Sequence, residues 1–191
     1  MPQVRQLAKE IRINHNLSLE LWDTGIHECR ILASMIGDPK LVTPKQMDNW
    51  VADFESWDVC DQVCGNLFDR TEFAMDKAIE YSTAKQEYIK RAGFVLMAEY
   101  AVHNKKARNE EFIKFFPLIE REARDERNFV KKAVNWALRQ IGKRNKTLHK
   151  IAIETAKRIQ QQESRSAKWI AKNALDELEN GLQISIFIIP K

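Results

Sequence analysis

Apolar residues recur along this chain with the spacing of an α-helix. From Val4 to Ile11 they stand at i, i+3, i+4 and i+7, which is the pattern of an amphipathic helix. The breaks fall where helices end or begin, at Gly37-Asp38-Pro39 and at the capping pair Thr43-Pro44. The pattern predicts further helices over residues 16–22, 26–36, 57–68, 71–81, 85–102, 110–122, 128–142, 147–161 and 164–178, and one that opens at Thr43.

The predicted helices look like copies of a repeated pair. A basic residue beside small apolar ones returns at Arg91, Lys132 and Lys168, with offsets of 41 and 36 residues. This spacing is near that of HEAT and armadillo repeats, whose helix pairs stack into a curved solenoid. We therefore predict an all-α fold, a HEAT-like or ARM-type α-α superhelix with a concave basic cleft, in one domain over residues 1–180. The second helix of each pair usually lines the concave side. That side would then carry Trp57, Asp61, Arg91, Lys132 and Trp136.

Both ends of the chain depart from the repeat. The first helix begins almost at residue 1, and we find no polar capping element before Val4. Residues 181–191 form an apolar tail. Its stretch from Ile184 to Ile189 is rich in β-branched residues and does not continue the helical pattern, so we expect no helix there.

Composition is that of an ordinary globular protein. The 191 residues are 44% hydrophobic and 30% charged, with only six Gly and five Pro. No run approaches the roughly 18 apolar residues of a membrane span, and the N-terminus lacks the apolar stretch of a signal peptide. Three cysteines provide no disulfide framework. We expect a reduced, cytoplasmic protein that is a monomer.

Positive charge is concentrated in one part of the chain. Residues 127–172 contain 13 Lys and Arg but two acids, for a net charge of +11, whereas residues 1–126 carry −5. A block of this density suits a polyanion such as DNA. It can equally be a solvated face with no partner.

Four motifs resemble those of the AlkD-type DNA alkylation-repair glycosylases. They are LWDTGIHECR at positions 21–30, WDVCD at 57–61, KRA at 90–92 and KAVNWALR at 132–139. They follow one another in the family's order over residues 4–178. The chain differs from the family in lacking its N-terminal helices and in the apolar tail.

The resemblance implies an enzyme that removes cationic alkylated purines, such as 3-methyladenine and 7-methylguanine, from duplex DNA. In that family two Trp and one Asp lie at the lesion and an Arg contacts the backbone, roles that would fall here to Trp57, Trp136, Asp61 and Arg91. No cofactor or metal is implied. The residues that would meet DNA are Arg91, Lys131, Lys132, Arg139, Lys143, Arg144, Lys146, Lys168 and Lys172.

These roles are chemically reasonable. Breaking the N-glycosidic bond leaves an oxocarbenium-like sugar, which a carboxylate such as Asp61 stabilises while it orients water. Aromatic faces attract a cationic base by about 0.5–2 kcal/mol each. On a helix, Trp57 and Asp61 lie one turn apart on the same face.

Each candidate also has a purely structural interpretation. Trp57 and Trp136 can be core residues, and Asp61 a surface acid. His27, Glu28 and Arg30 suit a cap or a buried ion pair that locks adjacent repeats better than they suit catalysis. Cys60 and Cys64 lack the further ligands of a zinc site. We interpret Trp22, Trp50 and Trp169 as packing residues.

Two other functions compete with the glycosylase. One is a non-catalytic DNA-binding protein that recognises damaged or branched DNA. The other is a protein-binding scaffold, as many solenoids are, although the basic block argues against it.

Overall fold

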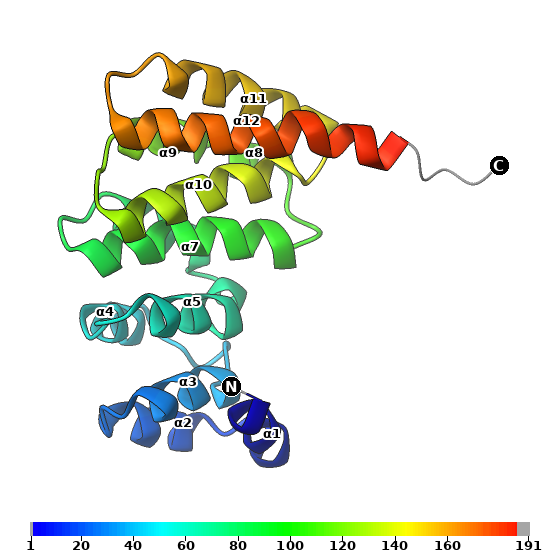
Figure 1. Cartoon of the computed structure of the whole chain (residues 1–191). Helices are drawn as coiled ribbons and strands as arrows, with labels where there is room; N and C mark the ends of the chain where they lie inside the picture. The colour runs from blue at the N-terminus through cyan, green and yellow to red at the C-terminus, as the bar shows by residue number, and fades with distance from the viewer. Residues whose placement is uncertain (1, 187–191) are drawn as a thin grey trace.

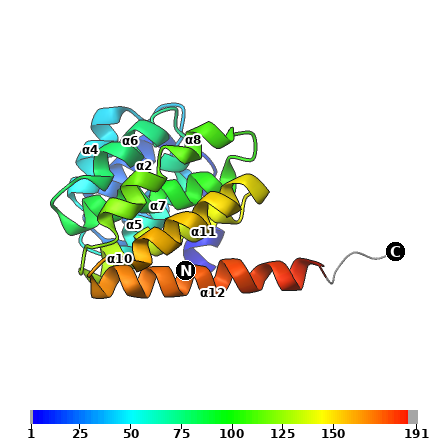
Figure 2. The ribbon, with the colours of Figure 1, turned by 90° about the horizontal axis from the view of Figure 1, so that it is seen from above.

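The computed structural model describes the backbone of residues 2–186 and the side chains of residues 2–179. Helices alternate between two layers that follow α1 (Pro2–Ile11) (Figures 1 and 2). The first layer contains α2 (His15–Asp23), α4 (Pro44–Ala52), α6 (Ala74–Ser82), α8 (Asn109–Ile113), α9 (Phe116–Glu122) and α11 (Lys146–Gln160). The second layer contains α3 (His27–Ile36), α5 (Trp57–Asn66), α7 (Glu87–His103), α10 (Asn128–Gly142) and α12 (Arg165–Ile186). Within the described residues, no helix is long and apolar enough to cross a membrane.

The helices of the second layer pack on one another in chain order. Helix α3 packs on α5, α5 on α7, α7 on α10, and α10 on α12. We call the outward surface of these five helices the second-helix face. The prediction of an all-α, HEAT-like solenoid is confirmed, and the predicted site residues do come from the second helices α5, α7 and α10.

Local sequence signals explain some of the helix ends, and side-chain caps begin α2, α4 and α11. Thr43 caps α4 by accepting a hydrogen bond from the Gln46 backbone N–H at 3.1 Å, and Pro44 follows as the first helical residue. The single helix predicted over 110–122 is wrong, because the chain forms α8 and α9 with a break between them. Pro117 explains this break: it has no N–H to donate to the carbonyl of Ile113, and its ring would clash with that carbonyl.

The C-terminal tail also differs from expectation. Helix α12 continues to Ile186, so the prediction that helical structure stops before Ile184 is wrong. Gly181 is a weak barrier, costing about 1 kcal/mol against Ala, and a helix that has already formed extends readily. Residues 187–191 lie outside the described residues.

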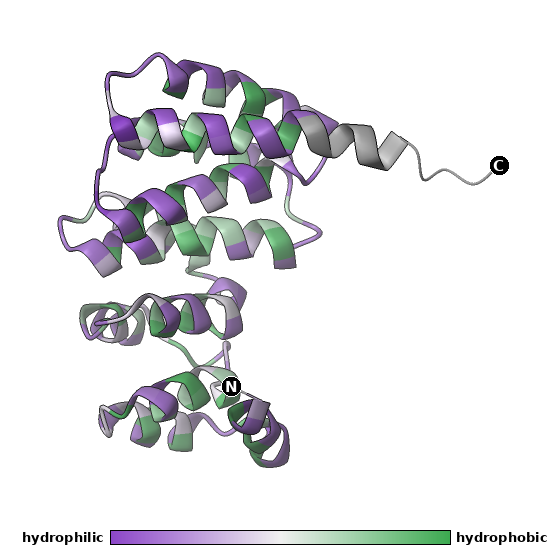
Figure 3. Cartoon of the chain, viewed as in Figure 1, coloured by the Kyte–Doolittle hydropathy of each residue, from purple (hydrophilic) through white to green (hydrophobic). Residues whose placement is uncertain are grey.

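Aromatic packing holds the N-terminal repeats together. Trp22 and Trp50 are buried and stacked, with ring centroids 4.0 Å apart, and Trp22 Nε1 donates to Asp53 at 2.9 Å. Hydrophobic and hydrophilic residues are interspersed along the helices (Figure 3). The packing role predicted for Trp22 and Trp50 is confirmed. Trp169 is 40% exposed, and its contact between helices is with the Lys131 ammonium of α10 and not with the core.

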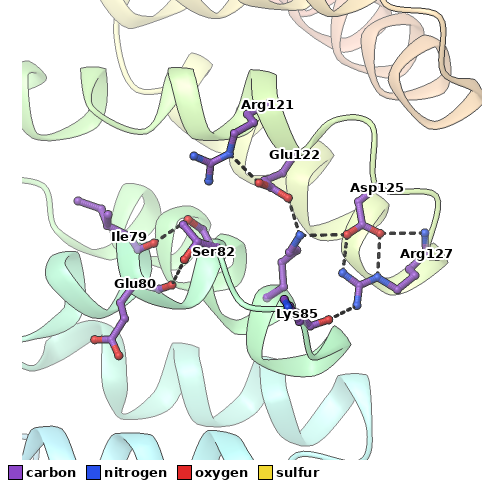
Figure 4. Close-up of polar contacts among 10 residues, drawn as sticks. Ile79, Glu80, Ser82, Lys85, Arg121, Glu122, Asp125 and Arg127 are labelled. Carbon is purple, nitrogen blue, oxygen red and sulfur yellow. Dashed lines mark hydrogen bonds and ion pairs between the residues drawn. The ribbon is translucent and has the colours of Figure 1, made fainter.

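A polar network joins the third and fourth helix pairs. Lys90 Nζ contacts Glu122 at 2.5 Å and Asp125 at 3.3 Å. Arg127 donates to Asp125 and to the Lys85 carbonyl, the latter at 2.7 Å (Figure 4). Arg127 is therefore occupied by an acid that lies outside the basic block.

Replacing Gly93 by Ala should destabilise the fold by about 1–3 kcal/mol, the usual cost of overpacking. A Cβ at Gly93 would lie 2.4 Å from the backbone nitrogen of Ser82, at a contact between α6 and α7. Backbone cannot rotate away as a side chain can, so the two helices must separate. Urea unfolding of the variant measures the change.

Gly25→Ala is the matched control. Gly25 has a φ of +70°, but no atom lies within 4 Å of a Cβ placed there. It should cost about 1–2 kcal/mol through backbone strain alone. A Gly93→Ala variant as stable as the parent would contradict the close packing of α6 and α7.

Candidate active site

Trp57 is a surface residue at the start of α5. Ser56 adopts the extended conformation of an N-cap residue, and Trp57 is the first helical residue. Its side chain is 51% exposed. Because a core tryptophan would be covered, the interpretation of Trp57 as core is wrong. Trp136 on α10 is different, since it is partly buried against the core.

Asp61, one turn after Trp57, forms a bidentate ion pair with Arg91 of α7. Arg91 Nε donates to Asp61 Oδ1 at 2.9 Å, and Nη2 donates to Oδ2 at 2.8 Å. The third nitrogen, Nη1, donates to the backbone carbonyl of Phe129 on α10 at 2.6 Å. The Arg91 side chain is only 6% exposed. One guanidinium therefore links three successive helices of the second layer, and little of it faces solvent.

Two opposing effects act on the Asp61 carboxyl. Burial raises its pKa, and the hydrogen bonds and charge of Arg91 lower it, with burial the larger effect. Burial lowers the pKa of Arg91, but the hydrogen bonds and charge of Asp61 raise it, and the net shift is upward. Since both carboxylate oxygens accept from a guanidinium, the geometry fits an ionised Asp61.

Glu99 is a second, partly buried acid near this pair, and the sequence analysis missed it. Its carboxylate lies over Gly65, where an added Cβ would be 2.7 Å from Glu99 Oε1. Burial raises its pKa to about 7, with the nearby His103 opposing and Asp69 and Asp61 reinforcing the shift. A glycine one turn after Asp61 was the available signal, because glycine inside a helix usually marks a close approach.

The acidic residue next to Trp57 joins two repeats. Asp58 Oδ2 contacts His27 Nε2 of α3 at 2.8 Å. Arg30 donates to the Asp53 carbonyl at 3.0 Å and lies over the Trp22 ring. The contact between adjacent repeats predicted for His27 and Arg30 is therefore confirmed, but the His27–Asp58 pair is partly exposed and not buried, and Glu28 is exposed.

The predicted DNA-binding residues divide into those with a partner and those without. Arg139 and Lys143 contact Glu177, and Arg144 donates to the carbonyls of Ala101, Asn104 and Ala107 at the end of α7. Lys146 begins α11, which belongs to the other layer. Within the described chain, no carboxylate lies within ion-pair distance of the remaining predicted lysines, Lys131, Lys132, Lys168 and Lys172.

An aromatic ring accompanies these lysines. Lys131 Nζ of α10 lies 5.0 Å from the ring centroid of Trp169 on α12. Asn135 and Asn173 continue the same seam with a hydrogen bond of 2.7 Å. The α10–α12 part of the second-helix face is therefore positively charged and carries an exposed tryptophan.

The cysteines are structural in this arrangement. Cys60 and Cys64 are buried, and each thiol points at a carbonyl of α7, Tyr88 and Ala92 respectively. Burial also raises the pKa of Cys64 well above its usual value. Over the described residues, no cluster of three or more His, Cys, Asp or Glu is placed to hold a metal ion.

Comparison with known proteins gives one family and one fold. A family model described as "DNA alkylation repair enzyme" matches residues 1–178. A solved structure described as "A new family of proteins related to the HEAT-like repeat DNA glycosylases with affinity for branched DNA structures" is similar, with a TM-score of 0.74 and 20% identity. The similarity covers 94% of this chain and 80% of that one. No curated protein matches the sequence.

Glu99→Gln should stabilise the protein at pH 8 and flatten its pH dependence. Because the pKa is about 7 in the folded chain against 4.5 for an ordinary Glu, the folded chain holds a proton that the unfolded chain releases between those values. The free energy of unfolding should fall as pH rises through this window, by up to about 3 kcal/mol. The variant should lose this fall, as urea unfolding at pH 5 and pH 8 would show.

Glu110→Gln is the matched control, because Glu110 is exposed. It should leave the pH dependence of unfolding unchanged. Parallel stability profiles for the parent and Glu99→Gln would show that Glu99 titrates as an ordinary surface acid.

Proposed function

Because this chain belongs to the DNA alkylation repair enzyme family, we propose that it is a DNA glycosylase for cationic alkylated purines in duplex DNA. Its substrates would include 3-methyladenine and 7-methylguanine. The observation that carries the proposal is the exposed Trp57 one turn from an Asp61 held by Arg91. The four motif segments at 21–30, 57–61, 90–92 and 132–139 support the same activity.

Trp57 supplies affinity for the charged base. Its ring is half exposed and so can present a π face to a cationic purine. A neutral purine gains no such attraction. Trp136 is less accessible, and we assign it a supporting contact at the edge of the site.

Asp61 supplies the charge that the reaction needs. Loss of a cationic base leaves positive charge on the deoxyribose, and a fixed carboxylate stabilises that charge without reorganising. Arg91 fixes this carboxylate through two hydrogen bonds. In this proposal Arg91 is a positioning residue, because its nitrogens are taken up by Asp61 and the Phe129 carbonyl and little of it faces solvent.

The phosphate contacts fall to the unpaired lysines of α10 and α12. Lys132, Lys168 and Lys172 are exposed, and Lys131 lies beside them against Trp169. Lysines without a protein partner can neutralise phosphates and release counterions from the duplex. Arg139 and Lys143 share Glu177 and would contribute less.

A non-catalytic DNA-binding role is the second candidate. Both Asp61 oxygens are already engaged by Arg91, so a bound sugar would have to share the carboxylate with a guanidinium. The similar solved structure belongs to proteins described as having affinity for branched DNA. In this alternative Trp57 and the lysines bind damaged or branched DNA, and no base is released.

Base release from a duplex that contains one 7-methylguanine tests the proposal. The protein should generate abasic sites that are cut by heating in alkali. Asp61→Asn should lower the single-turnover rate by roughly 10²–10³-fold, as expected for loss of a fixed charge. Trp57→Ala should lower it by roughly 2–30-fold without disturbing the fold, because the ring is exposed.

Asp58→Asn is the matched control for Asp61→Asn. Asp58 lies in the same turns of α5 but pairs with His27 rather than Arg91, so its rate should stay within a few fold of the parent. Thermal melts of every variant exclude unfolding as the cause of a lost rate. Tight duplex binding by the parent without base release would favour the non-catalytic candidate.

A further inference from the structure

Helix α1 lies against the second-helix face instead of pairing with a first-layer helix. It packs on α3, and Arg5 Nη2 reaches past α3 to Gln62 Oε1 of α5 at 3.4 Å. Seen from above, α1 lies on the side of the molecule where α10 and α12 lie, opposite α4, α6 and α8 (Figure 2). Helix α1 is therefore placed at the N-terminal end of the same surface that carries Trp57 and the unpaired lysines.

One side of α1 is basic. Arg5 and Lys9 are one turn apart and share a helix face, and Arg12 follows directly after the helix. All three are exposed, and within the described chain none has a carboxylate at ion-pair distance. The acid of this helix, Glu10, accepts a hydrogen bond from Gln6 at 2.9 Å. Within the described chain these positive charges therefore have no carboxylate partner, and the contact of Arg5 with Gln62 leaves its charge uncompensated.

The backbone at Arg12 gives a second, independent indication. Arg12 has a φ of +62°, the sole positive value at a non-glycine residue in the described part of the chain. It ends α1 in the left-handed conformation, where Gly or Asn is the usual residue and other L side chains are disfavoured. The structure therefore holds an arginine where glycine would relieve strain, which is reasonable if the side chain itself has a role.

Spacing along the second-helix face matches a turn of DNA. Packed helices lie about 8–10 Å apart, so the four steps from α3 to α12 span roughly 32–40 Å. One turn of B-form DNA is about 34–36 Å long. The Trp57–Asp61 site on α5, held by α7, lies between the two ends of that span.

We propose that Arg5, Lys9 and Arg12 form a second phosphate-binding element, which grips the duplex on the side of the site opposite Lys132, Lys168 and Lys172. The inference rests on the proposed function in that it requires DNA on the second-helix face. Arginine and lysine side chains bind phosphate oxygens through charge-assisted hydrogen bonds. The site is then flanked by positive charge at both ends, and its acids Asp58, Asp61 and Glu99 lie between two phosphate contacts.

The salt dependence of DNA binding tests this element. Each phosphate that a protein neutralises contributes about −0.9 to the slope of log K against log salt concentration. The variant Arg5→Gln/Lys9→Gln/Arg12→Gly should bind a 24-base-pair duplex with a slope smaller by roughly 2–3. Its thermal stability should equal or exceed that of the parent, because glycine removes the strained φ.

Lys40→Gln/Lys45→Gln/Lys114→Gln removes the same charge elsewhere. These lysines are exposed and belong to the loop before α4, to α4 and to the end of α8, so the slope should change by much less than one contact. The double variant Arg5→Gln/Lys9→Gln keeps the end of α1 intact and should lose roughly two contacts. If the α1 variant bound DNA with the same salt-dependence slope as the parent, the phosphate-binding role of α1 would be wrong, and the proposed function would be unaffected. A parent chain that shows no salt-dependent binding would overturn the proposed function with it.

Discussion

The bidentate contact between Arg91 and Asp61 is the interaction on which the site depends. It fixes the carboxylate, links α5 to α7, and reaches α10 through the Phe129 carbonyl. Removing one partner of such a buried pair leaves an unpaired charge, which typically costs about 3–5 kcal/mol. Lysine could not replace the arginine, since a single ammonium cannot match two carboxylate oxygens and a carbonyl at once.

Pairing of charges explains where the surface is free to bind. The basic block is less positive in space than in sequence, because Glu120, Asp125, Glu177 and Glu179 together pair with five of its residues. Among the residues that the structure describes, the positive charges without an acidic partner on the second-helix face gather at its two ends, on α1 and along α10 and α12. A polyanion would therefore meet attraction on both sides of the Trp57–Asp61 site, and the central acids would be shielded from its phosphates by that spacing.

Periodicity was sufficient to predict the architecture, because burial of one face per helix leaves a repeating record in the sequence. It could not tell which side of a helix meets solvent at a helix end. Trp57 and Trp22 look alike in the pattern, yet one is half exposed and the other is buried. Pro117 was a local signal that could have divided the predicted helix at 110–122.

Tertiary partners were beyond what spacing could predict. Arg144 stands in the basic block with the same apparent claim on DNA as Lys132. In space its guanidinium satisfies carbonyl groups at the end of α7. Sequence spacing also did not predict that Glu99 lies near Asp61, because the carboxylate comes from another helix and lies over Gly65. The sequence analysis gave Asp61 a role in catalysis and Arg91 a contact with the DNA backbone. In the structure the two side chains form one bidentate ion pair.

The Arg91–Asp61 ion pair also affects which glycosidic bonds the proposed site could break. The face of the Trp57 ring has no proton to donate to a nitrogen of the base. Asp61 can only accept hydrogen bonds, because Arg91 holds it ionised. A neutral purine needs protonation before it can leave, whereas a cationic alkylated purine carries its positive charge from the start. A carboxylate already shared with a guanidinium exerts a weaker field than a free one, which suffices only for a leaving group that is activated in advance. If the chain is the proposed glycosylase, the same residues that limit the strength of Asp61 would direct it toward charged lesions and protect normal bases.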